Sequence, residues 1–221
     1  MTHVTELECP NCGATFPEQP NFEGCPACSS TTVRSNLTPV YDYDSIDLGK
    51  GDIEARDGGV WAVPELLPVD EEYAVSIGEG ATPLIAASDF AERWEISNLF
   101  IKDESQNPTW SYKDRLSSVA LAKASELGVD AVTIASTGNH GASTAAYAAS
   151  AGIECIIFTI PQVPATMKTL MQVYGARVIA TETHDERWEI MRKCIDEYDW
   201  YPTGNYVSPP VGSNFYGIEG Y

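Results

Sequence analysis

The chain has few basic residues: 13 lysines and arginines stand against 32 aspartates and glutamates, for a formal net charge of -19 over 221 residues. A surface with this charge repels nucleic acids and anionic membranes, which argues against both as partners. The acidic residues are spread along the chain and form no tail. Because salt screens their mutual repulsion, the composition predicts adaptation to high salt, and an ordinary acidic cytoplasmic protein is the alternative.

Long apolar runs are also missing. No segment approaches the roughly 18 apolar residues that a membrane span requires. The first six residues, M-T-H-V-T-E, have neither the basic nor the apolar region of a signal peptide. With 43% hydrophobic residues the chain has enough apolar surface for a sizeable core. We therefore expect one or two globular domains in the cytoplasm.

Residues 1–35 are short of aliphatic side chains and could bury little apolar surface alone. They contain four of the six cysteines, in two C-x2-C pairs: Cys9 and Cys12, then Cys25 and Cys28. Two such pairs supply the four thiolates of a tetrahedral zinc site. Two disulfides are the alternative, but the expected cytoplasmic location favours zinc. The pattern thus predicts a zinc ribbon without revealing its purpose.

From about residue 80 the chain alternates strands and helices. Strands are predicted at 98–102, 131–135, 154–160, 177–181 and 201–205, and helices at 90–94, 114–127, 139–150, 164–174 and 183–198. Such alternation is typical of an α/β fold with a parallel sheet and right-handed crossovers. Residues 36–75, interrupted by prolines and glycines, are expected to wrap around this body with little regular structure.

Ligands bind parallel sheets past the carboxyl ends of the strands, and two loops of interest fall there. The first leads to Lys113 at the entry of a helix. A lysine that is partly desolvated, or beside a cation such as Arg115, can lose its proton near neutral pH and attack an aldehyde. Taken alone, Lys113 would be a surface lysine paired with Asp114.

The second loop, residues 136–141, joins a strand to a helix whose first N–H groups favour an anion. It combines hydroxyl groups, an amide and glycines that allow close backbone approach: Ser136, Thr137, Gly138, Asn139 and Gly141. His140 is either a general base or a histidine satisfied within the loop. An ordinary helix cap has the same composition. Because consecutive strand ends of a parallel sheet lie side by side, the two loops together predict a pyridoxal phosphate (PLP) site.

Five motifs follow one another along the chain: E-G-A-T-P-L at 79–84, K-D-E at 102–104, N-P-T at 107–109, S-Y-K-D-R at 111–115 and S-T-G-N at 136–139. Together they resemble the threonine synthase family of fold type II (tryptophan synthase β-like) PLP enzymes, over roughly residues 75–221. The G-I-E-G segment at 217–220 looks like part of the same pattern. The paired cysteines resemble those of some archaeal-type members.

The resemblance implies parallel sheets with flanking helices, divided into consecutive domains. These are a zinc ribbon in 1–35, the first part of a large PLP domain in 36–115, a small α/β domain in 116–215 and the start of a return to the large domain in 216–221. Family members are longer, and their glycine-rich phosphate loop and their partner for the pyridine nitrogen lie beyond the equivalent of Tyr221. The chain is therefore expected to be a fragment, incomplete at its C-terminus, that binds PLP weakly.

The resemblance also implies roles for individual residues. Lys113 would bond covalently to PLP and move protons, and Asn139 would hydrogen-bond the 3′-oxygen of the cofactor. Ser136, Thr137, Gly138 and Asn139 would receive the substrate carboxylate. The implied reaction converts O-phospho-L-homoserine and water into L-threonine and phosphate. The implied zinc is structural, and its ribbon would stabilise the N-terminus or an oligomer contact such as that of a homodimer.

Three positions depart from the family pattern. Trp110 and Leu116 stand where the family usually has glycine, and Tyr112 stands where it usually has phenylalanine. A bulky Trp110 beside the lysine would reshape the pocket, so the substrate stays open, with threonine dehydratase and cysteate synthase as related alternatives. A zinc-ribbon protein that binds a small ligand without catalysis is the alternative from another class.

Overall fold

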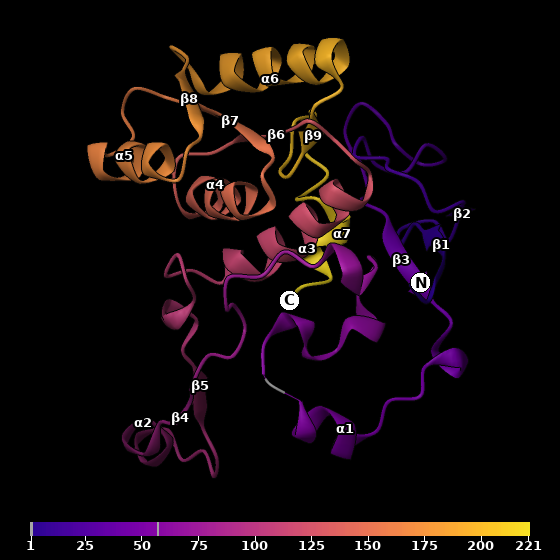
Figure 1. Cartoon of the computed structure of the whole chain (residues 1–221), viewed down its shortest axis with the longest axis vertical. Helices are drawn as coiled ribbons and strands as arrows, with labels where there is room; N and C mark the ends of the chain where they lie inside the picture. Colours follow the sequence, from indigo (N-terminus) through magenta and orange to yellow (C-terminus); the bar gives the residue numbers. More distant parts are fainter. Residues whose placement is uncertain (1, 57) are drawn as a thin grey trace.

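The computed structural model describes residues 2–56 and 58–221, and its largest sheet is parallel, in the order β8-β7-β6-β9 (Figure 1). Its strands are β6 (Ala131–Ala135), β7 (Glu154–Thr159), β8 (Arg177–Ala180) and β9 (Tyr201–Pro202). The register pairs Val132 with both Cys155 and Tyr201. The parallel sheet predicted from the sequence is therefore confirmed, although β9 is shorter than expected.

Helices cover both faces of this sheet (Figure 1). On one face lies α6 (His184–Tyr198), and on the other lie α4 (Asn139–Ala151) and α5 (Ala165–Val173). The strand β7 shows why its sequence is apolar throughout: Cys155 and Ile157 face the cluster under α4, whereas Ile156 and Phe158 face α6. A strand buried on both faces needs no polar alternation.

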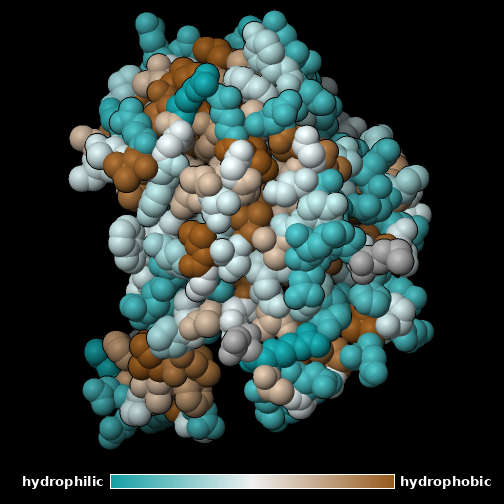
Figure 2. Space-filling model, viewed as in Figure 1, coloured by the Kyte–Doolittle hydropathy of each residue, from teal (hydrophilic) through white to brown (hydrophobic). Residues whose placement is uncertain are grey.

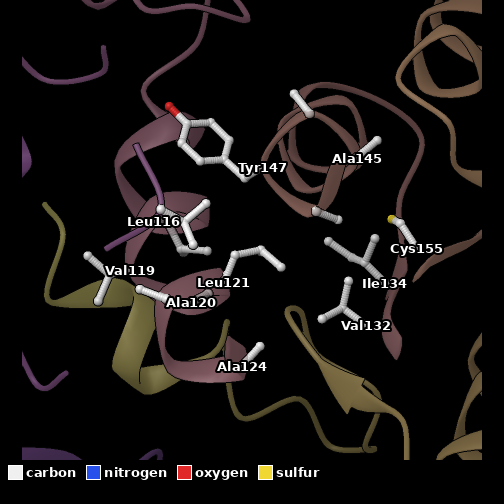
Figure 3. Close-up of a cluster of buried hydrophobic side chains, with 14 of the residues drawn as sticks. Leu116, Val119, Ala120, Leu121, Ala124, Val132, Ile134, Ala145, Tyr147 and Cys155 are labelled. Carbon is white, nitrogen blue, oxygen red and sulfur yellow. The ribbon is translucent and has the colours of Figure 1, made fainter. Parts of the chain in front are cut away.

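The helix α3 (Lys113–Glu126) packs against α4 and fills the main core. Figure 3 shows Leu121 of α3 pointing toward Ile134 of β6. Leu116, one of the three departures from the family pattern, is fully buried in the same cluster. Its side chain therefore contributes to packing and not to the surface where a ligand would bind.

The N-terminal residues form a small antiparallel sheet in the order β2-β1-β3. Its strands are β1 (Val4–Glu8), β2 (Thr15–Phe16) and β3 (Thr38–Tyr41). Because β3 pairs with β1, residues that we expected to be irregular complete this sheet. The rest of 36–75 is irregular as predicted, with only short helical turns: α1 (Lys50–Ala55), η1 (Tyr43–Ser45), η2 (Val60–Ala62), η3 (Pro64–Leu66) and η4 (Glu71–Tyr73).

The strand β5 (Phe100–Lys102) does not join the parallel sheet, contrary to the prediction. It pairs antiparallel with β4 (Leu84–Ala86), and α2 (Ser88–Arg93) lies between them in sequence. No strand was predicted at β4, which supplies the hydrogen-bond partners that β5 would otherwise need from another strand. This unit projects from the body, and hydrophobic side chains gather on its surface (Figures 1 and 2). Within the described ranges, no helix is long and apolar enough to cross a membrane.

Candidate functional site

Lys113 is the first residue of α3, and its side chain is half-buried. Its Nζ lies 3.2 Å from the hydroxyl oxygen of Tyr221 and 4.4 Å from the ring centre of Tyr112. Burial would lower the pKa of Lys113, but the contacts with the two tyrosines outweigh it and the pKa is raised. The amine is thus held as an ammonium group, which differs from the expectation that desolvation would free it of its proton.

The sequence predicted Arg115 beside the amine of Lys113. Its guanidinium instead pairs with Glu104 through two contacts of 2.8 Å. The same carboxylate accepts hydrogen bonds from Thr82 Oγ1 and Asn107 Nδ2, each at 2.8 Å. Four of the five family motifs thus meet at Glu104, which lies in the turn η5 (Glu104–Gln106). These four motifs therefore form one polar network that fixes the start of α3.

The charge of Glu104 makes this network sensitive to acid. Hydrogen bonding to Arg115, foremost, lowers the pKa of Glu104 from 4.5 to about 2. A lowered pKa in the folded state stabilises the protein above the unfolded value, and this contribution is lost as pH falls from about 4.5 through about 2. We expect Glu104→Gln to remove about 2 kcal/mol of that acid-dependent loss, measured by urea unfolding across this pH range. An unchanged pH profile in the variant would contradict the role of this carboxylate.

The turn before Lys113 is anchored by Asp114 and not by the lysine. Asp114 is fully buried and accepts a hydrogen bond of 2.6 Å from the backbone N–H of Thr109. Burial raises the pKa of this carboxyl. The alternative of a surface Lys113 paired with Asp114 is therefore wrong. Trp110, which follows Thr109 in this turn, has a φ of +59° and is 66% exposed.

The left-handed backbone of Trp110 is a conformation that favours glycine, the residue that the resemblance implies at this position. This conformation costs a residue with a Cβ atom roughly 1 kcal/mol and costs glycine almost nothing. We expect Trp110→Gly to raise the free energy of unfolding by up to about 1 kcal/mol, measured by denaturant titration. Trp110→Ala is the matched control, because it removes the indole and keeps the strain. Equal effects of the two substitutions would show that the backbone is not strained.

The loop after β6 is shaped by Ser136. Its Oγ accepts hydrogen bonds from the N–H groups of Gly141 at 2.9 Å and Gly138 at 3.3 Å. A Cβ on Gly141 would lie 2.9 Å from Met171 Cε and 3.0 Å from Ser136 Cβ, so a larger residue there would force these side chains to shift. A Cβ on Gly138 would meet open space. The loop is therefore folded around the Ser136 hydroxyl, and its Gly138 side is accessible.

Several donors of this loop have no partner in the described part of the chain. Thr137 and Asn139 are exposed and their side chains make no hydrogen bond, and the N–H groups of Thr137, Asn139 and His140 find no protein acceptor. Such unpaired amides at the start of a helix favour an anion. Among the described residues the buried Nε2 atom of His140 has no partner. Burial, with the charge of Lys113 second, lowers the pKa of His140 to about 3. His140 is thus neutral and not satisfied within the loop.

The two loops are brought together by helix packing and not, as expected, by neighbouring strands of one sheet. Ser117 and Ser143 lie one turn into α3 and α4, and their hydroxyl groups are 2.8 Å apart. Both helices join β6 through short connections, so they run in similar directions and their first residues, Lys113 and Asn139, lie at the same end. An amine, unpaired amides and a free carboxamide at one edge fit the aldehyde and the anionic groups of PLP.

The four N-terminal cysteines form one cluster, as the sequence predicted. Their Sγ atoms all lie within 4.8 Å of one another, with Cys9 and Cys28 at 3.6 Å and Cys12 and Cys25 at 3.7 Å. Disulfide sulfurs would be about 2 Å apart, so these pairs are not disulfides. A tetrahedral zinc–thiolate site with bonds of about 2.3 Å places its sulfurs about 3.8 Å apart. The cluster therefore fits the predicted metal.

Sequence reasoning missed Tyr221 as a neighbour of Lys113 and Glu104 as the centre of the polar network. It also missed Glu79, which is 2% exposed and accepts a hydrogen bond of 2.8 Å from the Tyr147 hydroxyl. Glu79 and Glu104 both lie in family motifs, and that position was a usable signal. No pattern in the sequence indicates the contact of Tyr221 with Lys113, because 108 residues separate them.

The sequence profile of the pyridoxal-phosphate dependent enzymes matches residues 75–221, and the chain belongs to this family. A threonine synthase of Methanocaldococcus jannaschii is 36% identical over 195 residues, which cover 86% of this chain and 46% of that protein. A threonine synthase of Methanosarcina acetivorans is 36% identical over 217 residues, which cover 97% and 50%. The chain thus spans about half the length of these relatives.

Solved structures agree on the fold. The chain is similar to the apo form of diaminopropionate ammonia lyase from Escherichia coli, with a TM-score of 0.55 and 17% identity, over 72% of this chain and 53% of that one. It is also similar to the processed form of threonine deaminase isoform 2 from Solanum lycopersicum, with a TM-score of 0.54 and 21% identity, over 63% and 37%. The fold expected from the sequence, that of type II PLP enzymes, is confirmed.

Proposed function

We propose that this chain is part of a PLP-dependent threonine synthase, a lyase that converts O-phospho-L-homoserine and water into L-threonine and phosphate. The observation that carries the proposal is the position of the Lys113 amine at the same helix ends as the N–H groups of Thr137, Asn139 and His140, which have no acceptor within the described residues. The relatives named threonine synthase support the substrate. The same proposal assigns a structural zinc ion to Cys9, Cys12, Cys25 and Cys28.

When bound, PLP supplies an electron sink for the negative charge that develops at the substrate Cα. Lys113 would hold the cofactor through its amine and carry the proton of the substrate Cα. Asn139 would orient the cofactor through its free carboxamide. Ser136, Thr137, Gly138 and Asn139, with the loop amides, would bind the substrate carboxylate. The contacts with the two tyrosines raise the pKa of Lys113 and so oppose the neutral amine that acts as a nucleophile.

Trp110 supports a second candidate substrate. It is exposed and lies three residues before the lysine, at a position where a synthase usually has glycine. Two reactions separate the candidates: phosphate release from O-phospho-L-homoserine identifies a threonine synthase, and 2-oxobutanoate from threonine identifies a dehydratase. Activity on neither substrate would favour a relative such as cysteate synthase. If the protein acts on none of these substrates and borohydride reduction leaves no PLP adduct on Lys113, a ligand-binding protein without catalysis becomes the better account.

The composition supports a second proposal, that the protein works in the cytoplasm of a salt-rich cell. With 32 acidic and 13 basic residues, self-repulsion destabilises the folded state at low ionic strength. Raising KCl from about 0.1 M to 1 M shortens the screening length from about 10 to 3 Å. We expect the midpoint of thermal unfolding to rise over this range, monitored by circular dichroism. An unchanged or falling midpoint would favour an ordinary acidic protein.

The division into a ribbon (1–35), a large-domain part (36–115), a small domain (116–215) and a return segment (216–221) is also a proposal. The pairing of β3 with β1 supports a ribbon boundary nearer to residue 41. A homodimer is the assembly that we propose, and light scattering of the purified protein measures it directly.

A further inference from the structure

The cysteine cluster is packed against the C-terminal helix α7 (Phe215–Ile218). Cys9 and Cys25, both fully buried, share a hydrophobic cluster with Leu7, Phe215 and Tyr216. The two aromatic residues are 1% and 0% exposed, so they have no room to move independently of the cysteines. A change in the position of the thiolates would therefore displace α7.

A polar contact joins the same module to α3. Glu18, which lies between the two cysteine pairs, forms an ion pair of 2.9 Å with Lys123 and accepts a hydrogen bond of 2.8 Å from the Tyr216 hydroxyl. Lys123 is 4% exposed, and its Nζ lies 4.7 Å from the ring centre of Tyr216. Lys123 also pairs with Glu126 and donates to the carbonyl oxygen of Pro68, so Glu18 is one of three oxygen partners that hold this buried cation in place.

The helix α7 lies directly on the first turn of α3, the helix that begins at Lys113. A Cβ on Gly217 would lie 2.9 Å from the carbonyl oxygen of Leu116, and a Cβ on Gly220 would overlap the carbonyl oxygen of Arg115. From β3 of the ribbon sheet, the Tyr41 hydroxyl donates to Glu219 at 3.4 Å. Tyr221 follows, with its hydroxyl 3.2 Å from Lys113 Nζ. A continuous set of tight contacts thus runs from the cysteines to the lysine.

We propose that the metal-loaded cysteine module positions the amine of Lys113 through α7, and that Tyr221 is the positioning residue at the end of this path. The module would then have a purpose in the PLP site, which its distance along the sequence conceals. The proposal rests on the proposed function for its importance to catalysis, but the coupling itself is a property of the amine.

The test measures how fast an amine-reactive acetylating reagent labels Lys113, with peptide mapping by mass spectrometry and exposed Lys50 as the internal reference. The protein is compared with zinc bound, after chelation, and as Tyr221→Phe. Loss of the tyrosine contact lowers the pKa of Lys113, so more of the amine is neutral. We expect labelling near pH 8 to rise about threefold to tenfold in Tyr221→Phe and after chelation, since each pKa unit is a tenfold change in neutral amine. Chelation of Tyr221→Phe adds little.

The matched controls are Tyr198→Phe, which alters an exposed tyrosine elsewhere, and Cys194→Ser, which alters a cysteine outside the cluster. Neither is expected to change Lys113 labelling. Equal labelling with and without zinc, or additive effects of chelation and Tyr221→Phe, would overturn the proposal. If chelation unfolds the protein, Tyr216→Phe decides, because it retains all four cysteines and breaks the contact with Glu18: faster labelling supports the path, and unchanged labelling refutes it. PLP binding enters none of these measurements, so failure of the proposed function is distinguished from failure of this coupling.

Discussion

Replacement of Lys113 by arginine is expected to weaken retention of PLP at least about 100-fold, or about 2.7 kcal/mol. Arginine keeps the positive charge and length but cannot form the covalent bond to the cofactor aldehyde. Only the contacts of the 136–141 loop would then remain. The measurement is an equilibrium titration with PLP, followed by absorbance, of the variant and the unaltered protein side by side.

The matched control is Lys168→Arg, which changes a lysine in the first turn of α5 whose Nζ donates, within the described residues, only to the carbonyl oxygen of Pro161. It is expected to retain PLP like the unaltered protein. Because Lys113 is half-buried and makes no ion pair within the described residues, Lys113→Arg is expected to unfold within about 0.5 kcal/mol of the parent. If Lys113→Arg retains PLP as well as the control does, another residue holds the cofactor.

The second large effect concerns Cys9. Structural zinc sites of this type contribute apparent binding free energies on the order of 10 kcal/mol, and that energy is available for folding. Cys9→Ser removes a fully buried ligand and is expected to abolish stoichiometric zinc and expose residues 2–41 to proteolysis. Zinc content by elemental analysis and the time course of trypsin cleavage after Arg34 measure both consequences.

Cys194→Ser serves as the control here too, because Cys194 lies on α6, away from the cluster. It is expected to bind one zinc ion per chain and to resist cleavage. Full zinc content in Cys9→Ser would show that the cluster does not need all four thiolates. Its Sγ distances of 3.6 and 3.7 Å would then have another explanation.

The strands and helices between residues 113 and 202 could be predicted because each carries a local signal, whereas the short α7 was not predicted. The run at 154–160 is apolar throughout and bounded by turn residues, and the structure has a strand at 154–159. Glycines after 126 and 151 end two helices as expected, at Gly128 and Gly152, each with positive φ. The pairing of β4 with β5 could not be predicted, because both strands are short, exposed and joined by 13 residues.

The residues of the candidate site were predicted from motifs, but the contacts that bring them together could not be. Lys113, Ser136 and Asn139 were indicated by motifs, since motifs record which side chains a reaction needs. The contact that brings the two loops together is a pair of small hydroxyl groups, Ser117 and Ser143, which no motif contains. Tyr221 reaches Lys113 only because Gly217 and Gly220 allow α7 to lie on α3, and such close packing has no local signature.

The central claim is that Lys113 carries the cofactor, and one measurement tests it most directly. The protein is incubated with PLP, reduced with borohydride, digested and mapped by mass spectrometry, so that any carbon–nitrogen double bond to a lysine is fixed. We expect the pyridoxyl group on the peptide containing Lys113, well above its level on the exposed Lys50 and Lys193. Labelling of the exposed lysines to the same extent as Lys113, or none on Lys113, would contradict it.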